Sequence, residues 1–286
     1  MTRVLITGGG GLVGQFITRR FLSERWQVAC LSRNAPKLSG VQHLPFTLGE
    51  TPVLPPATVL VHCAFDHAPG RYRGGEGDDP DKFRKRNLDG TLRLFDAAEA
   101  ALIPQVIFLS SRAVYGDYPA GTALDETLPP RPDSLYGQVK LAAERALADM
   151  ASAEFRTISL RATGVYGPSN SGAHKWSGLF ADFLNGNTIA PRIATEVHGD
   201  DLADAVWRLK SAPNGVYNAS DITLDRHDLL ALVAQGTGCP HALPDRADAT
   251  KVNTMTTAKL RATGWHPGGM TKLAENIPKL LEHVGP

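Results

Sequence analysis

The sequence predicts an α/β fold, with a doubly wound parallel sheet and a smaller, partly discontinuous C-terminal substrate region. Two observations support this. Short apolar runs of strand length recur along the chain, and the segments between them are long enough to form helices. The first run leads directly into a glycine-rich turn and then into an amphipathic segment. Alternation of this kind is typical of parallel strands with helices on both faces of the sheet.

Each element follows from the spacing of its apolar residues. Strands are predicted at short, largely apolar runs, and helices where apolar residues recur every three or four positions. After residue 165 this alternation loosens, which marks the start of the substrate region. The expected strands are 4–6, 28–31, 59–63, 106–109 and 157–160; the expected helices are 81–101, 136–151, 201–209, 224–235, 257–262 and 271–284. We expect a dinucleotide-binding domain over 1–165, elements near 196–220 that return to it, and a mainly substrate-binding region over 166–286.

The glycine-rich turn follows the first strand. Gly8, Gly11 and Gly14 are three residues apart, which lets the chain turn sharply, approach a diphosphate and pack the next helix closely. Backbone N–H groups at the start of that helix favour an anion. An ordinary tight turn does not require this strand and helix on either side. We therefore expect a Rossmann dinucleotide site that includes Gly8, Gly10, Gly11, Leu12, Val13 and Gly14.

Composition narrows the class of ligand. The 286 residues contain 30 basic and 29 acidic residues, a net charge of +1, which provides no electrostatic surface for nucleic acid or an anionic membrane. The cysteines, Cys30, Cys63 and Cys239, form no Cys-x-x-Cys pair, so we expect neither a disulfide framework nor a metal site. No apolar run is long enough to span a bilayer. These features indicate a cytoplasmic protein with a small-molecule substrate.

A tyrosine and a lysine are spaced for acid–base chemistry. Tyr136 and Lys140 are four residues apart, so in a helix both project from one face. A nearby ammonium stabilises a phenolate, and we expect it to lower the pKa of Tyr136. Ser111 ends a predicted buried strand at the carboxyl edge of the sheet, where its hydroxyl could hold a reacting oxygen against the phenol. Taken alone, the Tyr–Lys pair could equally belong to a surface helix.

Further motifs follow in order between residue 4 and about residue 267. Together with the glycine turn and with Ser111, Tyr136 and Lys140, these further motifs make the chain resemble the extended short-chain dehydrogenase/reductase family, of the NAD-dependent epimerase/dehydratase type. The motifs are Val61-His62-Cys63-Ala64, Asn87-Leu88-Asp89-Gly90-Thr91, Val114-Tyr115-Gly116, Val165-Tyr166-Gly167-Pro168 and Val197-His198-Gly199-Asp200-Asp201-Leu202-Ala203.

The resemblance implies roles for residues and a quaternary structure. Ser111, Tyr136 and Lys140 would be catalytic, and Lys140 would also hold the nicotinamide ribose. Cys63 and Ala64 would contact the cofactor, and Asn87 would lie near its ribose. A homodimer would form through the helices 81–101 and 136–151.

The chain departs from many NAD-preferring relatives at the end of its second strand. The segment Leu31-Ser32-Arg33-Asn34 offers no carboxylate to the adenosine ribose. Arg33 could instead pair with a 2′-phosphate, and Ser32 could add a hydrogen bond. We expect NADP to be preferred over NAD. The alternative is that Arg33 stacks on the adenine without selecting the phosphate.

The substrate side departs further. Gly164 stands where nucleotide-sugar epimerases usually carry an asparagine, and Ala194-Thr195 where they carry an Arg-Asp pair. Arg112-Ala113 replaces the Asp-Glu pair of the dehydratases, which disfavours dehydration. The segments 66–80, which includes Arg71 and Arg73, and 172–176 are candidates for substrate contact.

These observations predict an NADP-dependent oxidoreductase that transfers hydride at a hydroxyl or carbonyl of a small polar or sugar-like molecule. One alternative is a sugar or nucleotide-sugar epimerase that retains its cofactor. Another is a redox sensor that binds dinucleotide without catalysis, although such sensors commonly lose the tyrosine and lysine that persist here.

Overall fold

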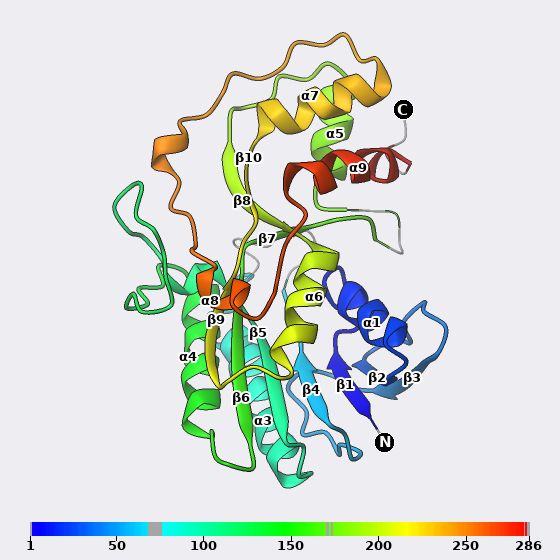
Figure 1. Cartoon of the computed structure of the whole chain (residues 1–286), viewed down its shortest axis with the longest axis vertical. Helices are drawn as coiled ribbons and strands as arrows, with labels where there is room; N and C mark the ends of the chain where they lie inside the picture. The colour runs from blue at the N-terminus through cyan, green and yellow to red at the C-terminus, as the bar shows by residue number, and fades with distance from the viewer. Residues whose placement is uncertain (1, 68–75, 170–171, 173, 283, 285–286) are drawn as a thin grey trace.

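The computed structural model describes residues 2–67, 76–169, 172, 174–282 and 284. Its largest element is a sheet of seven parallel strands, in the order β3-β2-β1-β4-β5-β6-β9 (Figure 1). This confirms the predicted doubly wound parallel sheet. The strands are β1 (Arg3–Thr7), β2 (Gln27–Ser32), β3 (Val41–Pro45), β4 (Val59–His62), β5 (Gln105–Ser111), β6 (Arg156–Ala162) and β9 (Gly215–Ala219).

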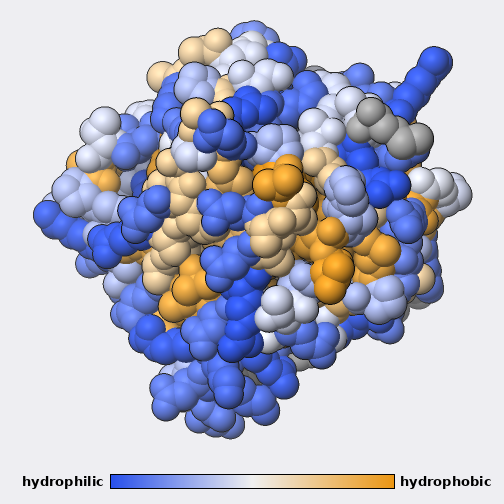
Figure 2. Space-filling model, turned by 90° about the horizontal axis from the view of Figure 1, so that it is seen from below, coloured by the Kyte–Doolittle hydropathy of each residue, from blue (hydrophilic) through white to orange (hydrophobic). Residues whose placement is uncertain are grey.

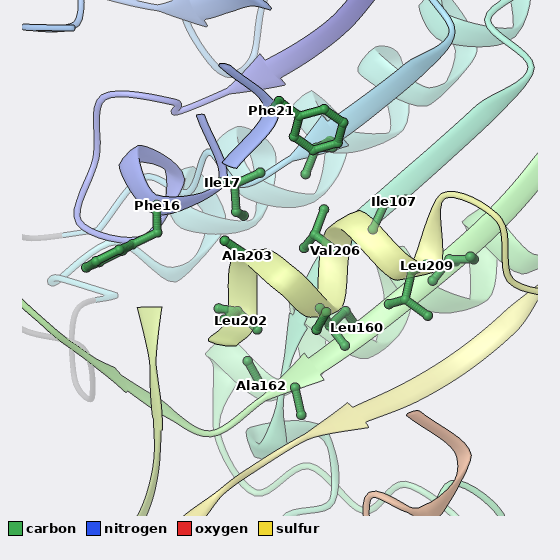
Figure 3. Packing of buried hydrophobic residues seen from close by; sticks show 14 of the residues in the cluster. Phe16, Ile17, Phe21, Ile107, Leu160, Ala162, Leu202, Ala203, Val206 and Leu209 are labelled. Carbon is green, nitrogen blue, oxygen red and sulfur yellow. The ribbon is translucent and has the colours of Figure 1, made fainter. Parts of the chain in front are cut away.

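Helices cover both faces of this sheet because the apolar side chains of its strands alternate. Val4 and Ile6 of β1 pack into one core cluster, and Leu5 packs into the cluster on the opposite face. Figure 3 shows the first cluster, in which α1 and α6 lie over the strands. That face carries α1 (Gly14–Ser23), α6 (Gly199–Leu209) and α8 (Ala258–Arg261); the other carries α3 (Gly90–Ala100) and α4 (Leu135–Asp149).

A second lobe lies beyond the carboxyl ends of the main-sheet strands (Figure 1). It contains a three-stranded sheet in the order β10-β8-β7 and its own apolar cluster of buried aromatic and aliphatic residues. These three strands were not predicted from the sequence. The elements are β7 (Gly164–Tyr166), β8 (Ile193–His198), β10 (Ile222–Asp225), α5 (Ser177–Leu184), α7 (Arg226–Thr237) and α9 (Gly269–Leu281).

Several predicted elements differ in detail from the observed ones. The expected helix 224–235 begins at Arg226, because Leu224 and Asp225 end β10 and the Asp225 carboxylate caps the helix by accepting from His227 N at 2.8 Å. The expected helix 81–101 is divided into α2 (Pro80–Arg84), a π-helical turn (Lys85–Asp89) and α3. Neither the π-helical turn nor β3 was predicted from the sequence.

The surface is largely hydrophilic. Seen from the end opposite the second lobe, apolar residues form scattered groups among hydrophilic ones (Figure 2). Val53 and Leu102 are large apolar side chains that are almost fully exposed, at 99% and 88%. No helix within the described part of the chain combines the length and the hydropathy needed to cross a bilayer.

Candidate active site

The glycine turn forms a narrow cradle at the carboxyl end of β1. Gly8 has a φ of +66°, and a Cβ there would lie 3.0 Å from the backbone of Ala64. A Cβ on Gly14 would lie 2.2 Å from the carbonyl oxygen of Gly8. The turn and the segment after β4 can approach this closely only because the side chains are absent. Gly10 and Gly11 are exposed at the tip, so the cradle fits a diphosphate next to the first turn of α1.

A chain of hydrogen bonds fixes the segment that follows β4. Thr7 Oγ1 accepts from the backbone N–H groups of Cys63 and Ala64, both at 3.1 Å, and donates to His62 Nδ1 at 2.6 Å. His62 Nε2 donates to Thr91 Oγ1 at 2.9 Å. Both ring nitrogens are therefore occupied with the imidazole neutral. Burial and the charge of Lys140 lower the pKa of His62 to about 3, so this histidine is structural.

Asn87 reaches the same segment from the π-helical turn. Its Nδ2 donates to the carbonyl oxygens of Asp66 at 2.8 Å and Phe83 at 3.1 Å, and its Oδ1 accepts from Asp66 N at 2.7 Å. The residue is 1% exposed. Its side chain thus holds the backbone beside Cys63 and Ala64. π-helical turns are frequent at functional sites, but the sequence carried no signal for this one.

Ser111, Tyr136 and Lys140 come together at the carboxyl edge. Ser111 ends β5, and α4 begins beside it, with Ser134 as the N-cap that accepts from Gly137 N at 3.2 Å. A Cβ at Gly137 would lie 2.5 Å from the carbonyl oxygen of Ala113, so this glycine lets α4 approach the turn after β5. The approach brings the hydroxyl of Ser111 near enough to Tyr136 to affect the pKa of its phenol. This role of Gly137 was not predicted from the sequence.

The pKa of Tyr136 differs from the sequence-based expectation. Burial raises the pKa of the phenol, and the hydrogen bond from Ser111 lowers it by less. Lys140 Nζ lies 5.9 Å from the Tyr136 ring centroid and donates to the carbonyl oxygen of Leu109 at 2.8 Å. Burial also lowers the pKa of Lys140 to about 7. The expected lowering of the Tyr136 pKa is therefore wrong for this structure, because desolvation dominates at both groups.

Phe65 joins these groups and was not predicted. Its ring packs edge-on against the ring of Tyr136, with centroids 5.0 Å apart, and lies 4.5 Å from Lys140 Nζ. Phe108 covers the same ammonium from β5 at 4.6 Å. Two aromatic faces thus stabilise the buried cation, and Phe65 shields the phenol from water. Phe65 directly follows Cys63-Ala64, so its position after a strand end was its only sequence signal.

The second strand places Ser32 and Arg33 near the cradle. Pro36, in the loop after β2, would touch a Cβ on Gly10 at 3.0 Å, so this loop borders the glycine turn. The hydroxyl of Ser32 donates to the carbonyl oxygen of Asn34 at 2.8 Å. The guanidinium side chain of Arg33 is exposed. The loop therefore presents an exposed cation beside the glycine turn.

Both candidate substrate segments are described only in part, and residue 173 of the segment 172–176 lies outside the described residues. Residues 68–75, which include Arg71 and Arg73, lie outside the described residues. In the other, Trp176 stacks on Tyr166 with centroids 5.1 Å apart, which anchors the segment to β7. Lys175 forms an ion pair with Glu196 of β8, directly above Gly164.

Comparison with known proteins agrees with this geometry. Residues 4–220 match the model of the NAD dependent epimerase/dehydratase family. The chain is 30% identical over 220 residues to a UDP-glucose 4-epimerase of Neisseria meningitidis serogroup B, covering 70% of this chain and 62% of that protein. It is 28% identical over 186 residues to a dTDP-6-deoxy-L-talose 4-dehydrogenase (NAD(P)(+)) of Kitasatospora kifunensis. That match covers 64% of this chain and 58% of that protein. The matched segments thus span about three fifths of these curated relatives.

The fold agrees over nearly the whole chain. The structure of a Thermus thermophilus UDP-glucose 4-epimerase in complex with NAD superposes with a TM-score of 0.78 at 25% identity, covering 98% of this chain and 99% of that one. The family model covers most of this chain and includes the glycine cradle, Ser111, Tyr136 and Lys140. This protein therefore belongs to the NAD-dependent epimerase/dehydratase family of enzymes.

Proposed function

We propose that the protein is a nicotinamide-dependent oxidoreductase that acts at a hydroxyl or carbonyl carbon of a small polar or sugar-like substrate. The nearness of the Ser111 hydroxyl to the half-buried phenol of Tyr136, with Lys140 one helical turn away, is the observation that supports it most directly. A hydroxyl, a phenol and an amine at the carboxyl edge of a parallel sheet match the groups that proton transfer to a carbonyl requires.

Each side chain has a distinct role in the proposed reaction. Tyr136 moves the proton to or from the substrate oxygen, and Ser111 holds that oxygen by a hydrogen bond. Lys140 holds the nicotinamide ribose by hydrogen bonding to its hydroxyls. The bound dinucleotide donates or accepts the hydride. The cradle of Gly8, Gly10, Gly11, Leu12, Val13 and Gly14, with Cys63 and Ala64 beside it, is proposed to bind the cofactor.

Replacing Tyr136 tests this proposal. Tyr136→Phe removes the hydroxyl but keeps the ring against Phe65, so kcat for a cofactor-coupled alcohol or aldehyde should fall about 100- to 10,000-fold. The affinity for the cofactor, measured by fluorescence titration, should stay nearly constant. Tyr118→Phe is a matched control, since Tyr118 donates to the carbonyl oxygen of Pro129, away from Ser111. Equal activity in Tyr136→Phe and the native protein would refute the role of Tyr136.

We propose that NADP is preferred over NAD. The exposed Arg33 and the absence of a carboxylate from Leu31 to Asn34 support this preference. Arg33→Ala should weaken NADP binding about 10- to 100-fold and change NAD binding little, because only the 2′-phosphate forms the charge-assisted bond. Lys279→Ala, an exposed cation on α9, is the control for a general loss of charge. Equal affinities for NADP and NAD in the native protein would contradict the preference.

Epimerisation is a second candidate activity, favoured by relatives that are UDP-glucose 4-epimerases. An epimerase uses the same proton-transfer groups but returns the hydride to the opposite face of the substrate. Net turnover distinguishes the two activities. Sustained change in the absorbance of the reduced nicotinamide indicates a dehydrogenase, whereas conversion between two stereoisomers without that change indicates an epimerase.

A further inference from the structure

A buried ion pair lies beside the proposed active site. The Lys175 ammonium and the Glu196 carboxylate are in direct contact, and their side chains are 19% and 7% exposed. Glu196 lies directly opposite Gly164 in the pairing of β7 and β8. A Cβ at Gly164 would lie 2.3 Å from Glu196 Oε2 and 2.6 Å from Lys175 Nζ. The ion pair therefore occupies the space that any larger residue at position 164 would need.

The main sheet places this ion pair close to the reacting groups. Gly164 is two residues beyond Ala162, whose neighbour in the register of β5 and β6 is Ser111. β7 and β8 pass between the main sheet and the helices of the second lobe (Figure 1). The ion pair thus lies on the side of the carboxyl edge from which a substrate would approach Ser111 and Tyr136.

Stability does not account for the ion pair. Desolvation of two buried charges offsets most of their mutual attraction, and apolar residues of similar volume are often equally stabilising. Burial lowers the pKa of Lys175, and the Glu196 carboxylate partly restores it. Nearby, the hydroxyl of Tyr166 is buried and has no hydrogen-bond partner among the described residues. Polar groups of this kind, arranged around a site, are typical of ligand recognition.

We propose that Lys175 and Glu196 form the specificity subsite for the substrate, and that they bind two neighbouring hydroxyl groups of an uncharged sugar or polyol. This inference rests on the proposed oxidoreductase function. The ammonium has three N–H donors and uses one toward Glu196, which leaves donors for a hydroxyl oxygen. The carboxylate has free lone pairs that accept from a second hydroxyl. One positive and one negative group suit a neutral ligand.

The same charges disfavour a nucleotide diphosphate at this position. The Glu196 carboxylate would face the diphosphate, and it neutralises Lys175 by direct contact. Arg192 also acts on Lys175, but its side chain is exposed and its charge is screened by solvent. Ala194, on the same face of β8 as Glu196, offers no charge. We therefore expect free sugars or polyols to bind more tightly than nucleotide sugars.

Binding to the full-length, NADP-loaded protein tests this. D-glucose and D-glucitol are the neutral probes and UDP-glucose is the charged one, with dissociation constants measured by calorimetry. Lys175→Met and Glu196→Gln should each weaken binding of the neutral probes about 10- to 100-fold, because each removes a charge-assisted hydrogen bond. The dissociation constant of NADP should not change. Lys279→Met, a lysine outside the site, should leave both constants unchanged.

A double variant tests whether loss of binding in the single variants is caused by unfolding. Lys175→Met/Glu196→Met replaces the ion pair by apolar groups of similar volume and should remain folded, with neutral-probe binding lost. The subsite is refuted if UDP-glucose binds the native protein more tightly than both neutral probes, if neither neutral probe binds, or if the variants bind them normally.

Turnover separates failure of the subsite from failure of the proposed function. Neutral-probe binding that depends on Lys175 and Glu196, without Tyr136-dependent oxidation of any alcohol, would support the subsite and refute the oxidoreductase activity. Tyr136-dependent turnover that is unaffected by Lys175→Met and Glu196→Gln would support the activity and refute the subsite.

Discussion

Lys140 places an ammonium group in the protein interior, at 4% exposure, and its stability cost depends on pH. The pKa of Lys140 in the folded chain, about 7, lies below the ordinary lysine value of 10.5. Between these values the unfolded chain binds a proton that the folded chain does not, so this lysine makes stability rise with pH across that window. Below pH 7 Lys140 is protonated in both the folded and the unfolded chain. Burial of its charge then lowers the free energy of unfolding by its full amount, up to about 5 kcal/mol.

Lys140→Met should therefore stabilise the cofactor-free protein at pH 6 and lose most of that advantage by pH 9. Urea unfolding at these two pH values measures the difference. Lys279→Met, which removes an exposed lysine, should show no such dependence. If Lys140→Met stabilised the protein equally at both pH values, burial of the Lys140 charge would not be the cause of the stabilisation.

His62 should stay neutral across the physiological range. Its pKa is lowered from 6.5 to about 3 by burial first and by Lys140 second. The unfolded chain takes up a proton below pH 6.5 that the folded chain refuses, so the contribution of His62 to stability is lost as pH falls from 6.5 toward 3. Nitrogen-15 NMR should show the Nε2–H tautomer with no titration between pH 5 and 8. His62→Gln identifies the resonances, and a midpoint in that range would contradict the expectation.

At the scale of elements, a buried ion pair fixes α4 to the main sheet. Glu144 of α4 and Arg161 of β6 are each 4% exposed in their side chains, with Arg161 Nη2 2.7 Å from Glu144 Oε2. Ser110 of β5 also donates to Glu144. Glu144 is one turn beyond Lys140 and raises its pKa, so the same contact positions both α4 and the charge it carries.

Glu144→Ala should destabilise the protein by about 3–5 kcal/mol, because it leaves the Arg161 charge buried and unpaired. It should also lower kcat, because α4 carries Tyr136 and Lys140. Denaturant unfolding and steady-state kinetics measure the two effects. Glu144→Met/Arg161→Met should recover much of the stability, whereas Asp228→Ala, which breaks an exposed ion pair with Arg246, should change it little. A small effect of Glu144→Ala would show that α4 is held by other contacts.

The sequence predicted the main-sheet elements well because their signals are local. β1, β2, β4 and β5 contain continuous apolar runs, β6 contains apolar residues at alternate positions, and the glycine turn has a fixed spacing after β1. The second-lobe strands were missed because β7 and β10 are only three and four residues long and are defined by pairing with β8.

In the candidate site, too, the features set by local sequence were predicted, and those set by contacts between distant segments were not. Ser111, Tyr136 and Lys140 were predicted from spacing and strand ends. The ion pair of Lys175 and Glu196 was not, since it depends on a loop and a strand that meet only above Gly164 in the folded chain. The pKa of Tyr136 likewise depends on burial, which spacing alone does not reveal.

At the scale of the whole molecule, α3 and α4 lie in contact on one face of the main sheet and present a mixed surface. Leu92 of α3 and Ala142 of α4 are half-buried within the monomer, and Asp96 and Arg145 beside them are exposed. Apolar residues flanked by opposite charges suit a two-fold symmetric interface, in which α3 and α4 of one subunit pack against α3 and α4 of the other. We propose a homodimer formed by α3 and α4.

Light scattering after gel filtration should give twice the chain mass of 30.7 kDa for the native protein. Ala142→Glu introduces a bulky charge at the centre of the proposed interface, and this variant should elute as a monomer. Because α4 carries Tyr136 and Lys140, the monomer should also have a lower melting temperature and a lower kcat. Ala274→Glu places the same charge on the exposed face of α9 and should remain dimeric. A native monomer, or a dimer that survives Ala142→Glu, would place the subunit contact elsewhere or remove it.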